Sequence, residues 1–199
     1  MNRRRSRSKK YRERSRDIGS WIWLIAIPVA VVALMMFGAA QSGAFVKVPE
    51  PSRNEDPADL LPLSNAGQPI YGGHDTSLIP ERPPTPREAL AGESTSQLDI
   101  PSASYNFGQI YDTWDVTHIF AVQNTGDADL LIGNLVTSCG CTTAELSSNV
   151  VPPGQRADLT VTFDADYHPT NGPVSRLVWF ATNDPIQPWV EMRITADVQ

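Results

Sequence analysis

The strongest constraint on this chain is a long uncharged stretch near its N-terminus. Ile18–Val46 contains no Asp, Glu, Lys or Arg, and its centre reads WIWLIAIPVAVVALMMFGAA. A helix needs about 20 apolar residues to cross the hydrocarbon core of a bilayer, and this stretch supplies them. Trp21 and Trp23 stand at its start, where indole rings favour the membrane interface. The sequence therefore predicts a single transmembrane anchor over residues 18–46.

The charges before this stretch predict its orientation. Residues 1–17, the basic arm, carry nine Lys or Arg against two acidic side chains. Basic residues beside a span stay in the cytoplasm, so the N-terminus is predicted inside and everything after Val46 outside the cytoplasmic membrane. A basic arm is also typical of nucleic-acid binding, but the adjoining span favours contact with anionic lipid. A cleaved signal peptide is the alternative to an anchor, because Gly38–Gln41 offers small residues for cleavage, although signal peptides typically have apolar regions of about 7–15 residues.

Residues 47–97 are predicted to form a disordered, proline-rich linker. Nine prolines fall between Gln41 and Gln97, and Phe45 and Tyr71 are the only aromatic residues there. Such a composition buries too little apolar surface to offset the entropy of ordering, and proline extends the chain toward polyproline II. We interpret the segment as a stalk, with a partner-docking segment around Glu81–Glu88 as the alternative.

Residues 98–199 are predicted to form a β domain. Short runs rich in Val, Ile, Thr, Phe and Trp alternate with turn clusters, and no stretch has a sustained helical period. About a hundred residues with seven such strands predict an all-β, seven-stranded immunoglobulin-like sandwich, with a partly open barrel as the alternative. The predicted strands are 102–107, 116–124, 130–138, 143–146, 157–164, 174–182 and 189–198.

Alternation within these strands predicts which side chains face the core. The predicted core positions are Val116, His118, Phe120, Val122, Leu159, Val161, Phe163, Val178, Phe180, Val190, Met192 and Ile194. Trp179 and Trp189 fall out of phase with their neighbours, so both are predicted to point to solvent from adjacent strands. An exposed indole pair is typical of a protein-binding surface. The alternative is a tryptophan pair covered by the linker or a loop.

Cys139 and Cys141 are the only cysteines of the chain. Outside the cytoplasm a disulfide between them persists. Residues two apart in an extended strand lie about 6.6–6.8 Å apart, at the upper limit for a disulfide, and Gly140 allows the backbone to bend. Four alternatives stay open: a structural or idle disulfide, free thiols in a turn, a copper(I) site and a redox pair. The absence of His or Lys nearby in the sequence argues against a redox pair.

No catalytic constellation is recognisable in the sequence. The domain of residues 98–199 carries twelve acidic and three basic side chains, a net charge of −9, which argues against nucleic-acid or phosphate ligands. Asp164–Gly172 echoes a calcium loop but has His168 and Pro169 where an oxygen ligand and a glycine are needed, which excludes an EF-hand.

Several motifs, taken in order, resemble a known family. YNFGQI, HIFAVQNTGDADLLI, SCGCTT, VPPGQRADLTVTFD and TNDP follow one another between Tyr105 and Val198. The set resembles the bacterial domain family of unknown function with an SCGCT signature, which is similar to Hydin-like immunoglobulin folds. The resemblance implies a sandwich and no established activity. The matching positions are Phe107-Gly108, Phe120, Asn124-Gly126, Cys139-Gly140-Cys141-Thr142, Pro153-Gly154, Phe163-Asp164 and Asn183-Asp184-Pro185.

These patterns together predict a non-enzymatic, membrane-tethered module outside the cytoplasm. Its expected partners are the lipid bilayer, through residues 18–46, and an envelope or membrane protein, through Trp179 and Trp189. No nucleic acid is expected. The alternative function is a copper(I)- or thiol-handling protein that acts through Cys139 and Cys141. No cofactor is expected, and bound copper(I) is the alternative.

Overall fold

The computed structural model describes residues 52–53 and 60–199. The predicted anchor, with Trp21 and Trp23, and the basic arm lie outside these residues, and no helix within them is long and apolar enough to span a membrane. The described elements are the strands β1 (Ile70–Gly72), β2 (Leu98–Asp99), β3 (Ser104–Ile110), β4 (Asp115–Asn124), β5 (Leu130–Thr137), β6 (Thr142–Leu146), β7 (Val150–Val151), β8 (Arg156–Asp164), β9 (Gly172–Thr182) and β10 (Trp189–Val198), and the short 3-10 helix η2 (Thr76–Leu78).

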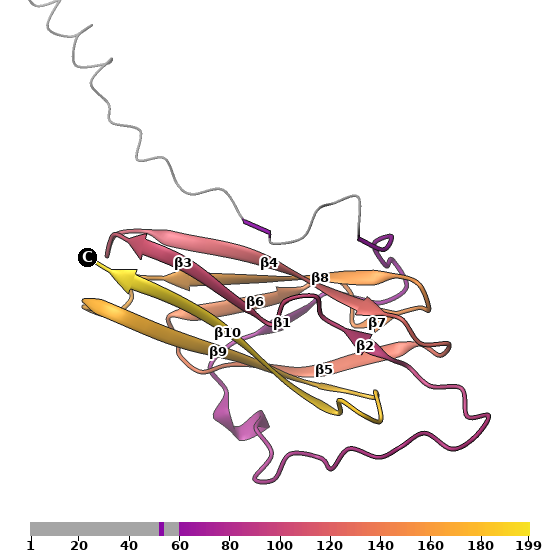
Figure 1. The fold of residues 1–199 in the computed structure, drawn as a ribbon. Coiled ribbons are helices and arrows are strands. Elements are labelled where there is room, and N and C mark those ends of the chain that lie inside the picture. The colour runs from indigo at the N-terminus through magenta and orange to yellow at the C-terminus, as the bar shows by residue number, and fades with distance from the viewer. Residues whose placement is uncertain (1–51, 54–59) are drawn as a thin grey trace, which may run out of the picture. The chain divides into compact units, whose positions relative to one another are not determined.

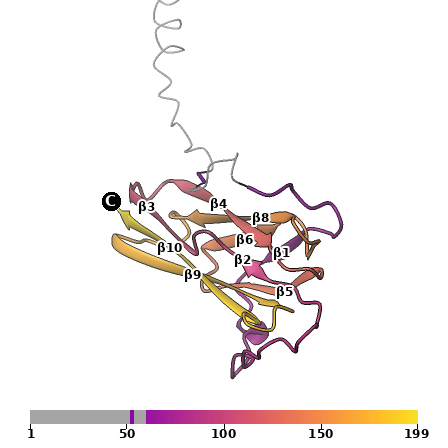
Figure 2. The same cartoon turned by 45° about the vertical axis from the view of Figure 1, so that its right-hand side comes forward.

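The strands form two sheets that pack face to face as a sandwich. One sheet has the order β1-β6-β8-β4-β2, and the other has the order β3-β10-β9-β5-β7. Figures 1 and 2 show β4, β6 and β8 in one layer and β5, β9 and β10 in the other. All neighbouring strands pair antiparallel except β3, which runs parallel to β10. The prediction of an all-β sandwich is confirmed.

The seven predicted strands correspond to β3, β4, β5, β6, β8, β9 and β10, with ends that differ by at most three residues and with β10 matched at both ends. The largest difference is in β3, which continues past Phe107 to Ile110. Gly108 makes this possible because it has a φ of 71° where the register between β3 and β10 shifts. An extra residue with positive φ is a β-bulge, which alternation alone does not reveal.

The predicted core is confirmed in full. Every other residue of β8 is buried, and β10 alternates in the same way. The buried side chains of both sheets join in one cluster in which Phe120, Phe163 and Phe180 are the largest members. His118 is part of this interior, since its ring stacks on Tyr105 with centroids 3.7 Å apart.

Residues 60–97 differ from the expected disordered linker, because they pack against the sandwich as a segment that we name the wrap. Near its start, Ser64 is buried and donates a hydrogen bond from its backbone N–H to Arg156 O at 2.7 Å. Strand β1 then pairs with β6, and Gly73 O accepts a hydrogen bond from Thr137 N of β5 at 2.9 Å. The wrap therefore bridges the edges of both sheets, which leaves fewer backbone groups open for unwanted strand pairing.

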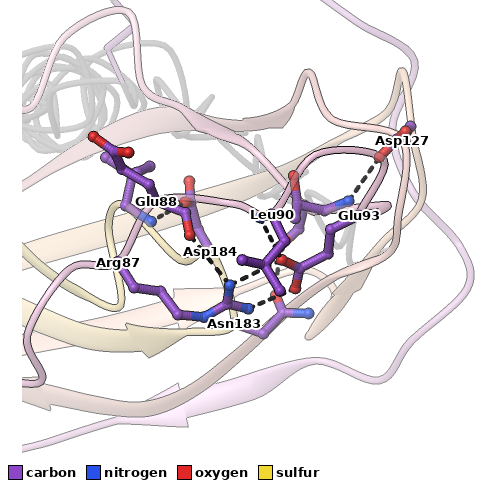
Figure 3. A network of polar contacts seen from close by, with 10 residues as sticks. Arg87, Glu88, Leu90, Glu93, Asp127, Asn183 and Asp184 are labelled. Carbon is purple, nitrogen blue, oxygen red and sulfur yellow. Dashed lines mark hydrogen bonds and ion pairs between the residues drawn. The ribbon is translucent and has the colours of Figure 1, made fainter.

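The second half of the wrap crosses to the other end of the sandwich. Arg87 N donates to Pro185 O at 2.7 Å, and the Arg87 guanidinium pairs with Glu93 at 2.7 Å. Figure 3 shows these two side chains facing each other beside the loop that carries Asn183 and Asp184. Further along, Thr95 N donates to Asp127 Oδ1 at 2.7 Å. Backbone and short polar contacts of this kind hold the second half of the wrap. Amino-acid composition does not report such contacts, so the composition of this segment predicted disorder.

Two of the resemblance motifs have a structural role where the wrap enters β2. Asn124 is buried; its Nδ2 donates to Val151 O at 2.7 Å, and its Oδ1 accepts the N–H of Gly126 at 3.0 Å. Asp184 is also buried, and its carboxylate accepts the N–H of Leu98 at 2.6 Å. These polar side chains satisfy backbone groups that would otherwise be buried without a partner.

Candidate functional site

The cysteine pair lies in the turn between β5 and β6. The structure joins Cys139 and Cys141 by a disulfide, with their Cα atoms 5.1 Å apart. The backbone turns here, because Thr142 N donates to Cys139 O at 3.2 Å. The expectation of an extended spacing at the upper limit for a disulfide is therefore wrong, and the observed separation lies within the usual range.

The two sulfur-bearing residues differ in their access to solvent. Cys141 is 3% exposed and belongs to the core cluster, whereas Cys139 is half-buried and Gly140 between them is exposed. A reagent in solution thus meets Cys139 first. This asymmetry is chemically significant, because the outcome of thiol exchange depends on which sulfur is attacked.

A cation contacts the buried sulfur. Arg176 of β9 donates a hydrogen bond from Nε to Cys141 Sγ at 3.0 Å. Its guanidinium also lies over the Phe163 ring, 5.4 Å from the centroid, and donates from Nη1 to Ser175 O at 3.0 Å. None of the ion pairs formed among the described residues involves Arg176. Its positive charge is therefore directed at the sulfur and an aromatic face.

Sequence reasoning missed Arg176, because it lies 35 residues after Cys141. A signal was nevertheless present. Arg176 shares the phase of Val178 and Phe180, so it occupies an inward-facing position of a strand whose nearest inward residues are apolar. A charged residue at such a position is seldom buried without a partner. The pairing of β9 with β5, the strand that leads into the cysteine turn, places this residue beside the disulfide.

The loop after β8 borders the cysteine turn. Tyr167 is 54% exposed, and a Cβ added to Gly140 would lie 2.8 Å from its hydroxyl oxygen. The loop is held by Asp164, whose Oδ1 accepts the N–H groups of Asp166 and Tyr167 at 2.9 Å each. The glycine in Cys-Gly-Cys therefore allows the close approach of Tyr167, whereas its φ is not positive and does not itself require glycine.

Trp179 and Trp189 lie where strand alternation predicts, on the outer face of the sheet that contains β9 and β10. Their inward neighbours Val178 and Val190 are buried. Both indoles are half-buried rather than fully open. Trp179 Nε1 donates to Glu191 Oε2 at 3.0 Å, and these two residues stand opposite each other across the strands. A role in partner binding stays a prediction.

The described part of the chain offers no cluster of further side chains that could ligate a metal. No group of three or more His, Cys, Asp or Glu side chains in residues 52–53 and 60–199 is arranged to hold a metal ion. His74 instead hydrogen-bonds Thr137 O through Nδ1 at 3.0 Å. Copper(I) binding by Cys139 and Cys141 stays a prediction for the reduced pair, because copper(I) requires free thiolates.

Fold and site together define an all-β sandwich domain with a disulfide in its β5–β6 turn. The chain belongs to the family described as "Protein of unknown function (DUF1573)", whose model matches residues 98–198. A search of curated proteins finds no match.

Solved structures of similar shape come from varied proteins. One is a protein of unknown function from Porphyromonas gingivalis W83, with 20% identity, a TM-score of 0.47, and coverage of 55% of this chain and 50% of that one. Another is the secreted serine protease VesC from Vibrio cholerae, with 15% identity, a TM-score of 0.41 and coverage of 51% and 23%. A third is the PapD-like domain 7 of human CEP192, with 9% identity, a TM-score of 0.45 and coverage of 57% and 92%. This chain thus spans half of the Porphyromonas protein and less than a quarter of VesC.

Proposed function

We propose that this protein is a membrane-tethered module outside the cytoplasm that binds an envelope protein through the outer face of β9 and β10. The observation that carries the proposal is an apolar strip formed by Trp179 and Trp189 with Leu177 and Ala181. All four are half-buried and lie on the outward phase of two paired strands. We name these four residues the indole strip. Tryptophan is enriched among the residues that dominate binding energy at protein interfaces.

The register of β9 and β10 places the strip residues side by side. Trp189 stands opposite Ala181, and Trp179 stands opposite Glu191. The hydrogen bond from the Trp179 indole to the Glu191 carboxylate orients that ring before any partner arrives. An interface whose side chains are ordered in advance loses less conformational entropy on binding.

The negative charge of the domain favours a partner with a basic surface. Residues 98–199 carry a net charge of −9. Near the strip, Glu191 accepts hydrogen bonds from Trp179 and from Arg193, the latter at 3.1 Å. A partner with an apolar centre and a basic rim complements this surface, since complementary charge raises association rates and selects against wrong partners.

Tethering and compartment are supported by sequence features. The uncharged residues 18–46 and the basic arm before them support a single-pass anchor with the N-terminus inside. A disulfide at Cys139 and Cys141 agrees with an oxidising compartment. The narrower resemblance to SCGCT-signature and Hydin-like immunoglobulin domains supports the sandwich and supplies no activity of its own.

The test compares cross-linked products from intact cells. We expect Trp179→Ala with Trp189→Ala to abolish a cross-linked adduct that the wild type forms with a basic envelope protein, while the melting temperature changes little. Tyr111→Ala is the matched control, because Tyr111 is an aromatic side chain that is 58% exposed away from the strip. An adduct that survives the double substitution contradicts the proposal, and so does a loss of about 3–5 kcal/mol in stability, which is typical of a buried aromatic.

A further inference from the structure

We propose that the Cys139–Cys141 disulfide takes part in thiol–disulfide exchange with protein or peptide dithiols, and that Arg176 stabilises the Cys141 thiolate released when it opens. Exchange adds a stoichiometric redox step to the binding role and does not depend on the indole strip. Three observations carry it: the unequal exposure of the two cysteines, the guanidinium at one sulfur, and a turn that hydrogen bonds hold in addition to the disulfide.

The guanidinium distinguishes this pair from an idle disulfide. A disulfide sulfur is a weak hydrogen-bond acceptor, whereas a thiolate carries a full negative charge, so the contact at 3.0 Å between Arg176 Nε and Cys141 Sγ strengthens when the pair opens. Arginine keeps its charge at every physiological pH. An opposite charge this close lowers the pKa of an acidic group. Stabilising the reduced form in this way makes a disulfide a stronger oxidant.

The turn survives opening of the disulfide because hydrogen bonds hold it. Thr137 Oγ1 donates to Cys139 O at 3.0 Å, Asp164 N donates to Cys141 O at 2.9 Å, and Ser138 N donates to Leu177 O at 2.9 Å. The disulfide itself encloses a single residue, so it removes little entropy from the unfolded chain. Both redox states are therefore compatible with the folded domain.

The exchange proceeds in two balanced steps. A partner thiolate attacks Cys139 Sγ, forms a new S–S bond with it and breaks the bond to Cys141, whose sulfur leaves with the electron pair as a thiolate beside Arg176. A second thiolate of the same partner then attacks the partner's own sulfur in the mixed disulfide. Its disulfide forms, and Cys139 leaves as a thiolate that takes a proton from water. The domain gains the two electrons that the partner loses. The partner's two thiol protons pass to water before attack, Cys139 takes one proton back from water, and Cys141 stays a thiolate, so one proton is released overall.

The unequal burial of the two cysteines predicts that the partner thiolate attacks Cys139. The second step predicts that the substrate is a dithiol. Cys139 is half-buried and is the more exposed of the two residues, whereas Cys141 is 3% exposed. A monothiol stalls at the mixed disulfide, where the Cys141 thiolate expels it again, so a dithiol is the productive substrate. The exposed ring of Tyr167 beside Gly140 offers an apolar contact for the peptide that carries the dithiol.

The first experiment measures the opening rate and the thiol pKa of the full chain purified in detergent. Because the chain has two cysteines, alkylation and mass measurement report this pair alone. We expect Arg176→Gln to slow opening by dithiothreitol about three- to tenfold. In the reduced protein we expect the substitution to raise one thiol pKa by about one to three units, read from thiolate absorbance. The titratable side chains on the neighbouring loop, Asp164, Asp166, Tyr167 and His168, are unchanged in this comparison.

Matched variants separate charge from folding. Arg193→Gln removes an exposed guanidinium from β10 and should change neither quantity, and Arg176→Lys should retain most of the pKa effect. If Arg176→Gln fails to fold, the thiol pKa values measured for the wild type and for Arg176→Lys decide whether the proposal stands. Two wild-type thiols that both titrate near about 8.5 overturn the proposal, as do equal opening rates for Arg176→Gln and Arg193→Gln.

The second experiment tests exchange and its direction. The oxidised chain should convert one equivalent of a reduced synthetic peptide with two cysteines into its disulfide, whereas free cysteine should give little net oxidation. In single substitutions, Cys141→Ser should react with a bulky aromatic disulfide reagent at least about tenfold faster than Cys139→Ser, because burial restricts access to a thiol. No peptide oxidation, or faster reaction at Cys141, overturns the proposal.

Discussion

His118 makes the fold sensitive to acid at the scale of a single residue. Its side chain is 0% exposed, its Nδ1 shares a hydrogen bond of 3.0 Å with Ser52 Oγ, and its ring meets Phe120 edge-on at 4.4 Å between centroids. Burial, and secondarily the charge of Arg53, lowers the pKa of His118 from 6.5 to about 4. The unfolded chain therefore binds this proton at higher pH than the folded one. Above about pH 6.5 His118 is neutral in both states and does not reduce the free energy of unfolding. As the pH falls from 6.5 toward 4, protonation of the unfolded chain lowers that free energy.

We expect this single group to lower the free energy of unfolding by about 3 kcal/mol between pH 7 and pH 4. Denaturant unfolding at a series of pH values measures the fall, and His118→Phe should remove the slope in that window. Glu93 acts in a separate window. The Arg87 hydrogen bonds lower its pKa from 4.5 to about 2, so its contribution is lost only below about pH 4.5. A wild-type curve as flat as that of His118→Phe contradicts the assignment.

At the scale of elements, strands of five residues or more were predictable and shorter ones were not. Strand β8 alternates between buried and half-buried side chains along its whole length, which is the pattern that periodicity detects. Strands β2 and β7 have two residues each and β1 has three, too few for a period to be recognised. Their positions depend instead on partners far along the chain, such as the pairing of Leu98 with Asn124.

In the candidate site, too, the features that depend on local spacing were predictable and those that depend on distant strand pairing were not. The cysteine pair and the outward phase of Trp179 were predictable, because each depends on local spacing. Arg176 was not predicted, because only the pairing of β5 with β9 brings it near the turn. The order of residues 60–97 was missed for a related reason: the wrap is held by backbone hydrogen bonds to distant strands, and proline content does not report such partners.

The attachment of the wrap to the β4–β5 turn predicts a cost for adding one methyl group. A Cβ at Gly126 would lie 2.4 Å from Thr95 O and 2.5 Å from Gln97 N, both backbone atoms that move only with the wrap. We expect Gly126→Ala to destabilise the fold by about 1–3 kcal/mol and to speed proteolysis between residues 80 and 97. Gly133→Ala in β5 is the matched control, since nothing lies within 4 Å of its added Cβ. Equal unfolding midpoints for the two variants contradict this role of Gly126.

At the scale of the whole molecule, the charge distribution separates the chain into two parts with different preferences. We expect the basic arm to be attracted by anionic lipid headgroups and the acidic domain of residues 98–199 to be repelled by them. The uncharged residues 18–46 between these parts are long enough to cross a bilayer. This order of charge favours one orientation, with the arm in the cytoplasm and the domain outside.

Protease treatment of intact spheroplasts tests this orientation. We expect added protease to release or digest the domain of residues 98–199, while an epitope tag placed before Met1 stays protected until the membrane is lysed. Replacing the nine basic residues of the arm by Gln removes the charge bias that sets the orientation, so part of the population should then expose the tag instead. Protection of the domain in the wild type would place Cys139 and Cys141 in a reducing compartment. A disulfide that opens for partner dithiols would then have no oxidising surroundings to restore it.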